Sequence, residues 1–150
     1  MEKTLYKKYS TTLQEKYGER VYKIPINLPI TCPNRDGEAG FGGCTFCGEE
    51  GTGFENVCNT VSIPEQIKIN IEYIGKRYKA QKFIAYFQNY SNTYMPISEF
   101  KKCLQQVSHE HIVEIAIATR PDCINDSYLE VLKEHRTATG HNITIELGLQ

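Results

Sequence analysis

From residue 21 onward, short apolar β-rich runs alternate with amphipathic helical stretches, and few folds accommodate that order. The pattern predicts strands at residues 21–27, 82–88, 112–118 and 142–147, and helices at residues 62–78, 97–107 and 125–135. Strands that alternate with helices pair in parallel through right-handed crossovers. The apolar runs at residues 83–87 and 115–118 fit strands that are buried on both faces. The sequence therefore predicts an α/β fold built on a parallel sheet or barrel.

The first 20 residues are interpreted as an amino-terminal helical extension, followed by the main domain at residues 21–150. Apolar side chains recur there at four-residue steps, at Leu5, Tyr9, Leu13 and Tyr17, which is typical of an amphipathic helix. We expect a docking or capping helix with a solvated basic face, and a face that contacts RNA is the minority alternative. Because the sequence ends directly after the last expected strand, we also expect a partial chain.

Three local features bear on how the elements begin, pair and end. Ser62 and Glu65 have the spacing of a capping box, and Pro64 suits the first turn of the helix that follows. Pro25 makes a central, fully paired position awkward for the first strand. His135 is expected near a helix end, where its positive form would suit the negative pole of the helix dipole.

Composition excludes several classes of protein. The 17 basic and 18 acidic residues nearly cancel, so the chain has no overall field that would attract nucleic acid or anionic lipid. Its apolar runs are far shorter than the roughly 20 residues of a membrane-spanning helix. The sequence starts without the apolar core of a signal peptide, so we expect a cytoplasmic protein without membrane contact.

The most informative segment is a glycine-rich loop at residues 28–61, which holds seven of the eleven glycines. It contains the pattern Cys-x11-Cys-x2-Cys, formed by Cys32, Cys44 and Cys47, directly after the first expected strand. Iron in iron–sulfur clusters prefers thiolate ligands, and glycines let the backbone wrap closely around a bulky inorganic core. Three cysteines can bind three irons of a 4Fe-4S cluster, which leaves the fourth iron open to an external ligand.

Other uses of these cysteines stay open on residue chemistry alone. Cys58 would complete a four-cysteine zinc site in a non-catalytic interaction module, although zinc ribbons normally supply a second closely spaced pair. Three disulfides are disfavoured by the expected reducing compartment. A redox-active Cys-x-x-Cys is disfavoured because glycines precede Cys44, where a strand should lead into a helix. Cys103 is expected to be a small buried apolar residue of a helix.

Four ordered motifs together resemble a known family. The run Cys32-Pro-Asn-Arg-Asp-Gly, followed by Gly-Gly-Cys44-Thr-Phe-Cys47, is similar to the cluster loop of radical S-adenosylmethionine (radical SAM) proteins of the YhcC/YtqA type, which are related to the catalytic subunit of Elongator. Phe87-Gln-Asn-Tyr-Ser-Asn-Thr-Tyr94, Ala118-Thr-Arg-Pro-Asp-Cys123 and Glu146-Leu-Gly-Leu-Gln150 resemble segments that end successive barrel strands in that branch. The resemblance implies a partial (β/α)6 TIM-like radical SAM barrel, here truncated after about four parallel strands.

The resemblance also implies an activity and its cofactors. A 4Fe-4S cluster on Cys32, Cys44 and Cys47 would cleave S-adenosylmethionine reductively to a 5′-deoxyadenosyl radical, which abstracts hydrogen from an unknown substrate. An external one-electron donor such as flavodoxin or ferredoxin is implied, and tRNA is a conceivable substrate. The residues expected to contact the cofactor are Phe46, Gln88, Asn89, Asn92, Thr119, Arg120, Glu146 and Gln150. The chain departs from the Gly-Gly-Glu motif with which many members bind the methionine amino group, and Gln88, Asn89 and Asn92 stand in its place.

Overall fold

The computed structural model describes residues 5–45 and 57–149. Four parallel strands form one open sheet in the order β1-β2-β3-β4, with β1 at Val21–Ile26, β2 at Lys82–Phe87, β3 at Ile112–Thr119 and β4 at Asn142–Leu147. Helices α3 (Ile63–Tyr78), α4 (Ile97–Gln105) and α5 (Asp126–Thr139) connect successive strands. The prediction of an α/β fold with four parallel strands is confirmed.

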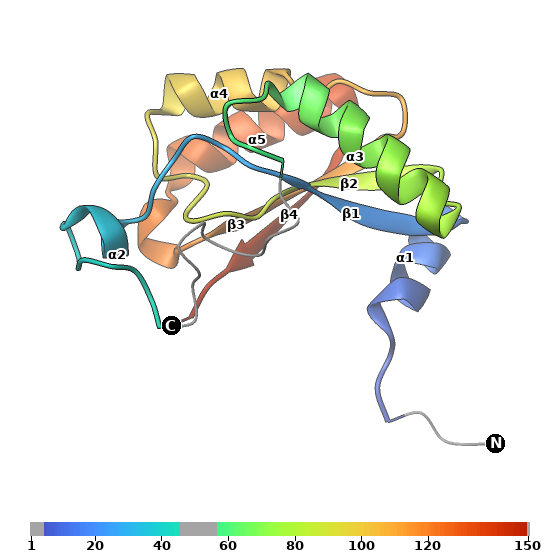
Figure 1. The fold of residues 1–150 in the computed structure, drawn as a ribbon, viewed down its shortest axis with the longest axis horizontal. Coiled ribbons are helices and arrows are strands. Elements are labelled where there is room, and N and C mark those ends of the chain that lie inside the picture. Colours follow the sequence, from blue (N-terminus) through green and yellow to red (C-terminus); the bar gives the residue numbers. More distant parts are fainter. Residues whose placement is uncertain (1–4, 46–56, 150) are drawn as a thin grey trace.

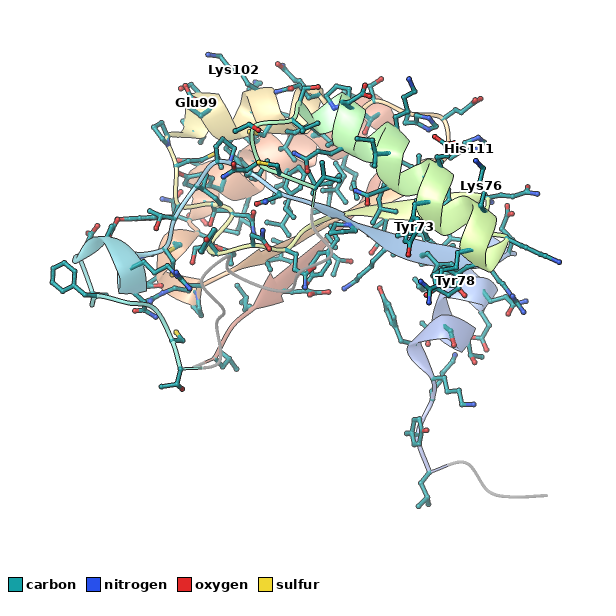
Figure 2. The ribbon with its side chains drawn as sticks, viewed as in Figure 1. Tyr73, Lys76, Tyr78, Glu99, Lys102 and His111 are labelled. Atoms are coloured by element: carbon teal, nitrogen blue, oxygen red, sulfur yellow. The ribbon has the colours of Figure 1, made fainter. Side chains whose placement is uncertain are left out.

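Helices α3, α4 and α5 lie together on one face of the sheet, and α1 (Tyr9–Tyr17) lies on the other (Figure 1). The strand residues that face the three helices form the main hydrophobic core, in which Phe83, Phe87 and Ile117 are fully buried. Glu99 and Lys102 on α4 point away from the sheet into solvent (Figure 2). Burial of a single stripe on each helix therefore fixes which face of the sheet the helices cover.

Helix α1 covers part of the opposite face of the sheet. Leu13 is its buried residue, and it packs with Val21, Ile84 and Ala116 in a second, smaller apolar cluster. Leu5, by contrast, lies almost fully exposed ahead of the helix. The expected helix is present, but its apolar stripe is only partly used for docking.

Two of the sequence-based expectations about element boundaries need correction. Ser62 precedes α3 in an extended conformation, yet its side chain makes no capping hydrogen bond, so the predicted capping box does not form. Pro64 does lie in the first turn of α3. Helix α5 runs four residues beyond the expected end, to Thr139, because the left-handed turn that stops it comes at Gly140 (φ +77°).

Pro25 is accommodated because β1 lies at an edge of the sheet and pairs only with β2 among the described residues. The carbonyl of Pro25 accepts a hydrogen bond of 2.9 Å from Asn70 Nδ2 on α3. A side chain of the covering helix thus satisfies a backbone group of the edge strand. Within the described residues, no helix is both long and apolar enough to cross a membrane.

Candidate functional site

The carboxyl ends of the four parallel strands meet at one edge of the sheet, and the cysteine segment begins there. Cys32 follows β1 and precedes the short helix α2 (Pro33–Asp36), which the sequence did not predict. Cys44 lies beyond α2, and both cysteines are partly exposed thiols. None of the five described cysteines forms a disulfide.

Each of the two sulfurs accepts a hydrogen bond from a polar side chain. Ser91, in the loop after β2, donates from Oγ to Cys32 Sγ at 3.3 Å. Asn34, on α2, donates from Nδ2 to Cys44 Sγ at 3.1 Å. Neither donor was expected from the sequence. The run of polar residues after β2 is nevertheless a sequence feature that could have indicated Ser91 as a hydrogen-bond donor at this edge.

The segment before Cys44 is held by contacts that only glycine permits. Gly43 has φ +83°, and a Cβ there would lie 2.8 Å from Nε of Arg35. The Gly43 amide donates to the carbonyl of Asn34 at 2.9 Å. The Arg35 guanidinium lies over the ring of Tyr90, 5.1 Å from its centroid, and Tyr90 itself has φ +60°. A positive φ at a non-glycine residue marks a strained position that neighbouring contacts must hold.

The loop after β2 ties β1 to β3 through buried amides. Asn89 donates to Oδ1 of Asn27 at 2.7 Å. Asn92 is fully buried, and its Nδ2 donates to the carbonyls of Phe87 and Ala118 at 2.9 and 2.8 Å. Among the described residues, Oδ1 of Asn92 has no hydrogen-bond partner. Asn89 and Asn92, two of the three residues expected to replace the Gly-Gly-Glu motif, therefore hold the strand ends together. Gln88, the third, is half-buried beside them.

Thr119 and Arg120 lie at the end of β3, as predicted, but each already has a protein partner. Thr119 Oγ1 lies 2.6 Å from Thr93 Oγ1. Arg120 binds Asp122 in a fork, from Nε to Oδ1 at 2.9 Å and from Nη2 to Oδ2 at 2.6 Å. The hydrogen bonds to Asp122 raise the pKa of Arg120. Arg120 lines a pocket together with Asn34 of the cysteine segment, and any carboxylate ligand there would have to compete with Asp122.

Glu146 lies on the face of the sheet opposite α3, α4 and α5, and forms a cluster with Lys23 and Tyr86. Lys23 Nζ contacts Oε1 of Glu146, and the Tyr86 hydroxyl donates to Oε2 at 2.6 Å. Burial alone would raise the pKa of Glu146, but the hydrogen bonds from Lys23 and Tyr86 hold it below its ordinary value. The period-two alternation of β1, β2 and β4 could have placed these three residues on one face before the structure was known.

Three of the expected site residues, Phe46, Cys47 and Gln150, lie outside the described residues. Within residues 5–45 and 57–149, no three His, Cys, Asp or Glu side chains are placed to share one metal ion. Cys58 therefore does not join Cys32 and Cys44 in such a group. Its sulfur is exposed and accepts a hydrogen bond from Thr60 Oγ1 at 3.2 Å.

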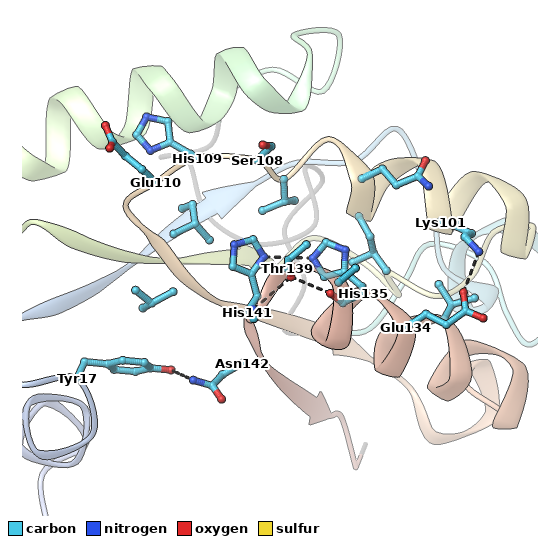
Figure 3. A pocket seen from close by; sticks show the side chains of 18 residues that line it. Tyr17, Lys101, Ser108, His109, Glu110, Glu134, His135, Thr139, His141 and Asn142 are labelled. Atoms are coloured by element: carbon cyan, nitrogen blue, oxygen red, sulfur yellow. Dashed lines mark hydrogen bonds and ion pairs between the residues drawn. The ribbon is translucent and has the colours of Figure 1, made fainter.

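A pocket of about 1070 Å³ lies away from the cysteines, at the amino-terminal edge of β3 and β4. His135 Nε2 and His141 Nδ1 face each other there at 3.2 Å, and the Tyr17–Asn142 and Lys101–Glu134 pairs also line it (Figure 3). Burial lowers the pKa of both histidines. Burial, together with the charge of His141, therefore disfavours the positive form of His135 on which the expected interaction with the helix dipole depends.

The chain is similar to several longer proteins. It is 37% identical over 139 residues to protein YhcC of Escherichia coli K12, covering 92% of this chain and 43% of the relative. It is 36% identical over 148 residues to the uncharacterized protein YtqA of Bacillus subtilis, covering 96% and 45%. It is 32% identical over 149 residues to the uncharacterized protein MJ0486 of Methanocaldococcus jannaschii, covering 97% and 44%. The chain thus spans less than half the length of these relatives. No family model and no solved structure matches it.

Proposed function

We propose that this chain is part of a radical SAM enzyme in which Cys32, Cys44 and Cys47 bind a 4Fe-4S cluster. The observation that carries the proposal is the placement of two partly exposed thiols, Cys32 and Cys44, at the carboxyl edge of a parallel sheet, each hydrogen-bonded by a neighbouring side chain. In parallel barrels and open α/β sheets, ligands bind at that edge.

We also propose that the sheet is one part of a (β/α)6 barrel. Its strands follow one another in sequence order, and α3, α4 and α5 all cover one face, whereas a doubly wound sheet reverses direction and uses both faces. Lys23 on β1 and Glu146 on β4 are in contact, although three interstrand spacings of a flat sheet amount to about 14 Å. The contact favours a sheet that curls toward this face, as the wall of a barrel does.

The chemistry of the donor set fits such a cluster. Thiolate sulfurs are the ligands of iron in these clusters, and the positive φ of Gly42 and Gly43 lets the chain turn sharply just before Cys44. When bound, the cluster supplies one electron that breaks a carbon–sulfur bond of S-adenosylmethionine. The side chains of Gln88 and Arg120 lie at the same edge, where a polar cofactor would be held.

Several features of the whole enzyme follow from this proposal. The cluster needs an external one-electron donor of the flavodoxin or ferredoxin class. A reducing compartment, the cytoplasm, suits thiols that must stay free for iron. The chain spans less than half the length of its curated relatives, so the substrate is a proposal about the whole protein, and a tRNA is one class to test.

Anaerobic reconstitution with iron and sulfide tests the proposal. We expect a brown protein with about four irons per chain, and loss of the iron on changing Cys32, Cys44 or Cys47 to Ala. Cys103→Ala is the matched control, because Cys103 lies on α4 away from the segment. Addition of S-adenosylmethionine to the reduced protein should then perturb the electron paramagnetic resonance (EPR) signal and yield 5′-deoxyadenosine.

Two outcomes would contradict the proposal. Equal iron loading of Cys44→Ala and Cys103→Ala would show that the segment does not bind the cluster. Stoichiometric zinc that is retained in air and lost on Cys58→Ala would establish instead the four-cysteine interaction module.

A further inference from the structure

We propose that Ser91 and Asn34 set the reduction potential of the cluster, because each donates a hydrogen bond to one of its cysteine sulfurs. The inference rests on the proposed function and deepens it. The contacts join a side chain of the β2 loop to Cys32 and a side chain of α2 to Cys44, so they come from two separate elements.

Ser91 is held in place for this role. The residue is 1% exposed, and its hydroxyl lies 3.3 Å from Cys32 Sγ. The amide of Tyr94 donates to the Ser91 carbonyl at 2.9 Å, and the adjacent Asn92 is anchored to β2 and β3. A buried hydroxyl on a fixed backbone has few other orientations, so its proton points at the sulfur.

Asn34 makes two contacts with the end of the cysteine segment, one with the Gly43 backbone and one with the Cys44 sulfur. Its backbone carbonyl accepts from the Gly43 amide at 2.9 Å, and its Nδ2 lies 3.1 Å from Cys44 Sγ. A thiolate bound to iron is an acceptor only, so the amide group of Asn34 must present its NH₂ rather than its oxygen to the sulfur. Asn34 therefore supplies the hydrogen-bond donor to Cys44 and also fixes the backbone just before Cys44.

Hydrogen bonds to ligating sulfurs shift the potential of iron–sulfur clusters in a defined direction. A donor withdraws electron density from the sulfur and stabilises the reduced cluster, which carries one more negative charge. The potential therefore rises, and the external one-electron donor reduces the cluster more easily. Removal of either donor should disfavour the reduced form about tenfold, which corresponds to a fall of about 59 mV for a one-electron couple.

The test is an anaerobic redox titration of the reconstituted chain, followed by EPR, with iron content measured on each sample. We expect lower midpoints for Ser91→Ala and Asn34→Ala, and recovery of the wild-type midpoint in Ser91→Thr, which keeps the hydroxyl. Ser108→Ala is the matched control, because Ser108 lies at the opposite edge of the sheet (Figure 3). A purely structural role for Ser91 would change iron content and leave the midpoint of the loaded fraction unchanged.

Failure of this inference is distinguishable from failure of the proposed function. If the wild-type chain takes up no cluster, the proposed function is wrong. If it loads and Ser91→Ala and Asn34→Ala keep the wild-type midpoint, only the present inference is overturned. Should either variant not load, resonance Raman spectra of the wild-type cluster decide: Fe–S frequencies that shift in D₂O support the hydrogen bonds, and unshifted frequencies overturn them.

Discussion

Gly43 is a residue at which the cysteine segment tolerates little change. An alanine there would need φ +83° and would bring its Cβ to 2.8 Å from Arg35 Nε. Gly42 has φ +80° but no atom within 4 Å of an added Cβ. Gly42→Ala therefore has only the energetic cost of a positive φ at a non-glycine residue. We expect Gly43→Ala to bind clearly less iron after reconstitution than Gly42→Ala, as measured by iron content per chain. Equal iron binding by the two variants would show that the Arg35 contact is unimportant.

Glu114 is a buried carboxylate, 2% exposed, and it depends on the donors around it. Lys16 Nζ and Thr144 Oγ1 each donate at 2.8 Å, and the Tyr17 hydroxyl donates as well. Burial would raise the pKa of Glu114, but these donors hold it below 4.5. Tyr17→Phe should lower the free energy of unfolding at pH 7 by about 2 kcal/mol.

Urea denaturation measures this loss, with Tyr22→Phe as the control because the Tyr22 ring stacks on Tyr78 away from Glu114. Since the folded pKa of Glu114 is depressed, its contribution is present above pH 4.5 and is lost as the pH falls through the folded value. The difference between Tyr17→Phe and the wild type should therefore shrink in acid. A difference that stays constant down to pH 3 would contradict the assignment of Tyr17 as a donor to Glu114.

At the scale of elements, we expect the contact between α5 and the start of β4 to depend on pH. Burial, and for His135 also the charge of His141, holds the pKa of both histidines below 6.5. The unfolded chain then binds more protons than the folded chain, so stability should fall as the pH drops below 6.5, by at most about 1.4 kcal/mol per pH unit for each histidine.

The measurement is the urea midpoint between pH 5 and pH 8. We expect His135→Gln to flatten this dependence, whereas His111→Gln, on the exposed turn before β3, should leave it unchanged. An equally steep dependence in His135→Gln would place the titrating group elsewhere.

The elements themselves were largely predictable because each carries its own pattern. The expected strand at residues 142–147 matches β4, and that at residues 82–88 differs from β2 by one residue. The missed helix α2 is only four residues long, too short for a hydrophobic period to show. The end of α5 was missed because Gly140, rather than the apolar pattern, sets it.

At the scale of the whole molecule, the sheet has two edge strands. Strands β2 and β3 have a neighbour on each side, whereas β1 and β4 each have one within the part of the chain that the structure describes. Hydrogen–deuterium exchange should therefore be slowest for the amides of β2 and β3 and faster for those of β4. If β4 exchanged as slowly as β3, another strand would have to pair with its outer edge.

The sequence by itself determined the α/β class, the strand and helix order and the position of Cys32 and Cys44 after the first strand, because these depend on local period and spacing. Only the tertiary structure decided which side chains meet. The contacts of Ser91 with Cys32, of Lys23 with Glu146 and of Arg120 with Asp122 depend on rotamers, strand register and sheet curvature. Ser91 lies 59 positions from Cys32 in the chain, and Glu146 lies 123 positions from Lys23. Packing makes these residues partners, and no local sequence pattern predicts contacts over such separations.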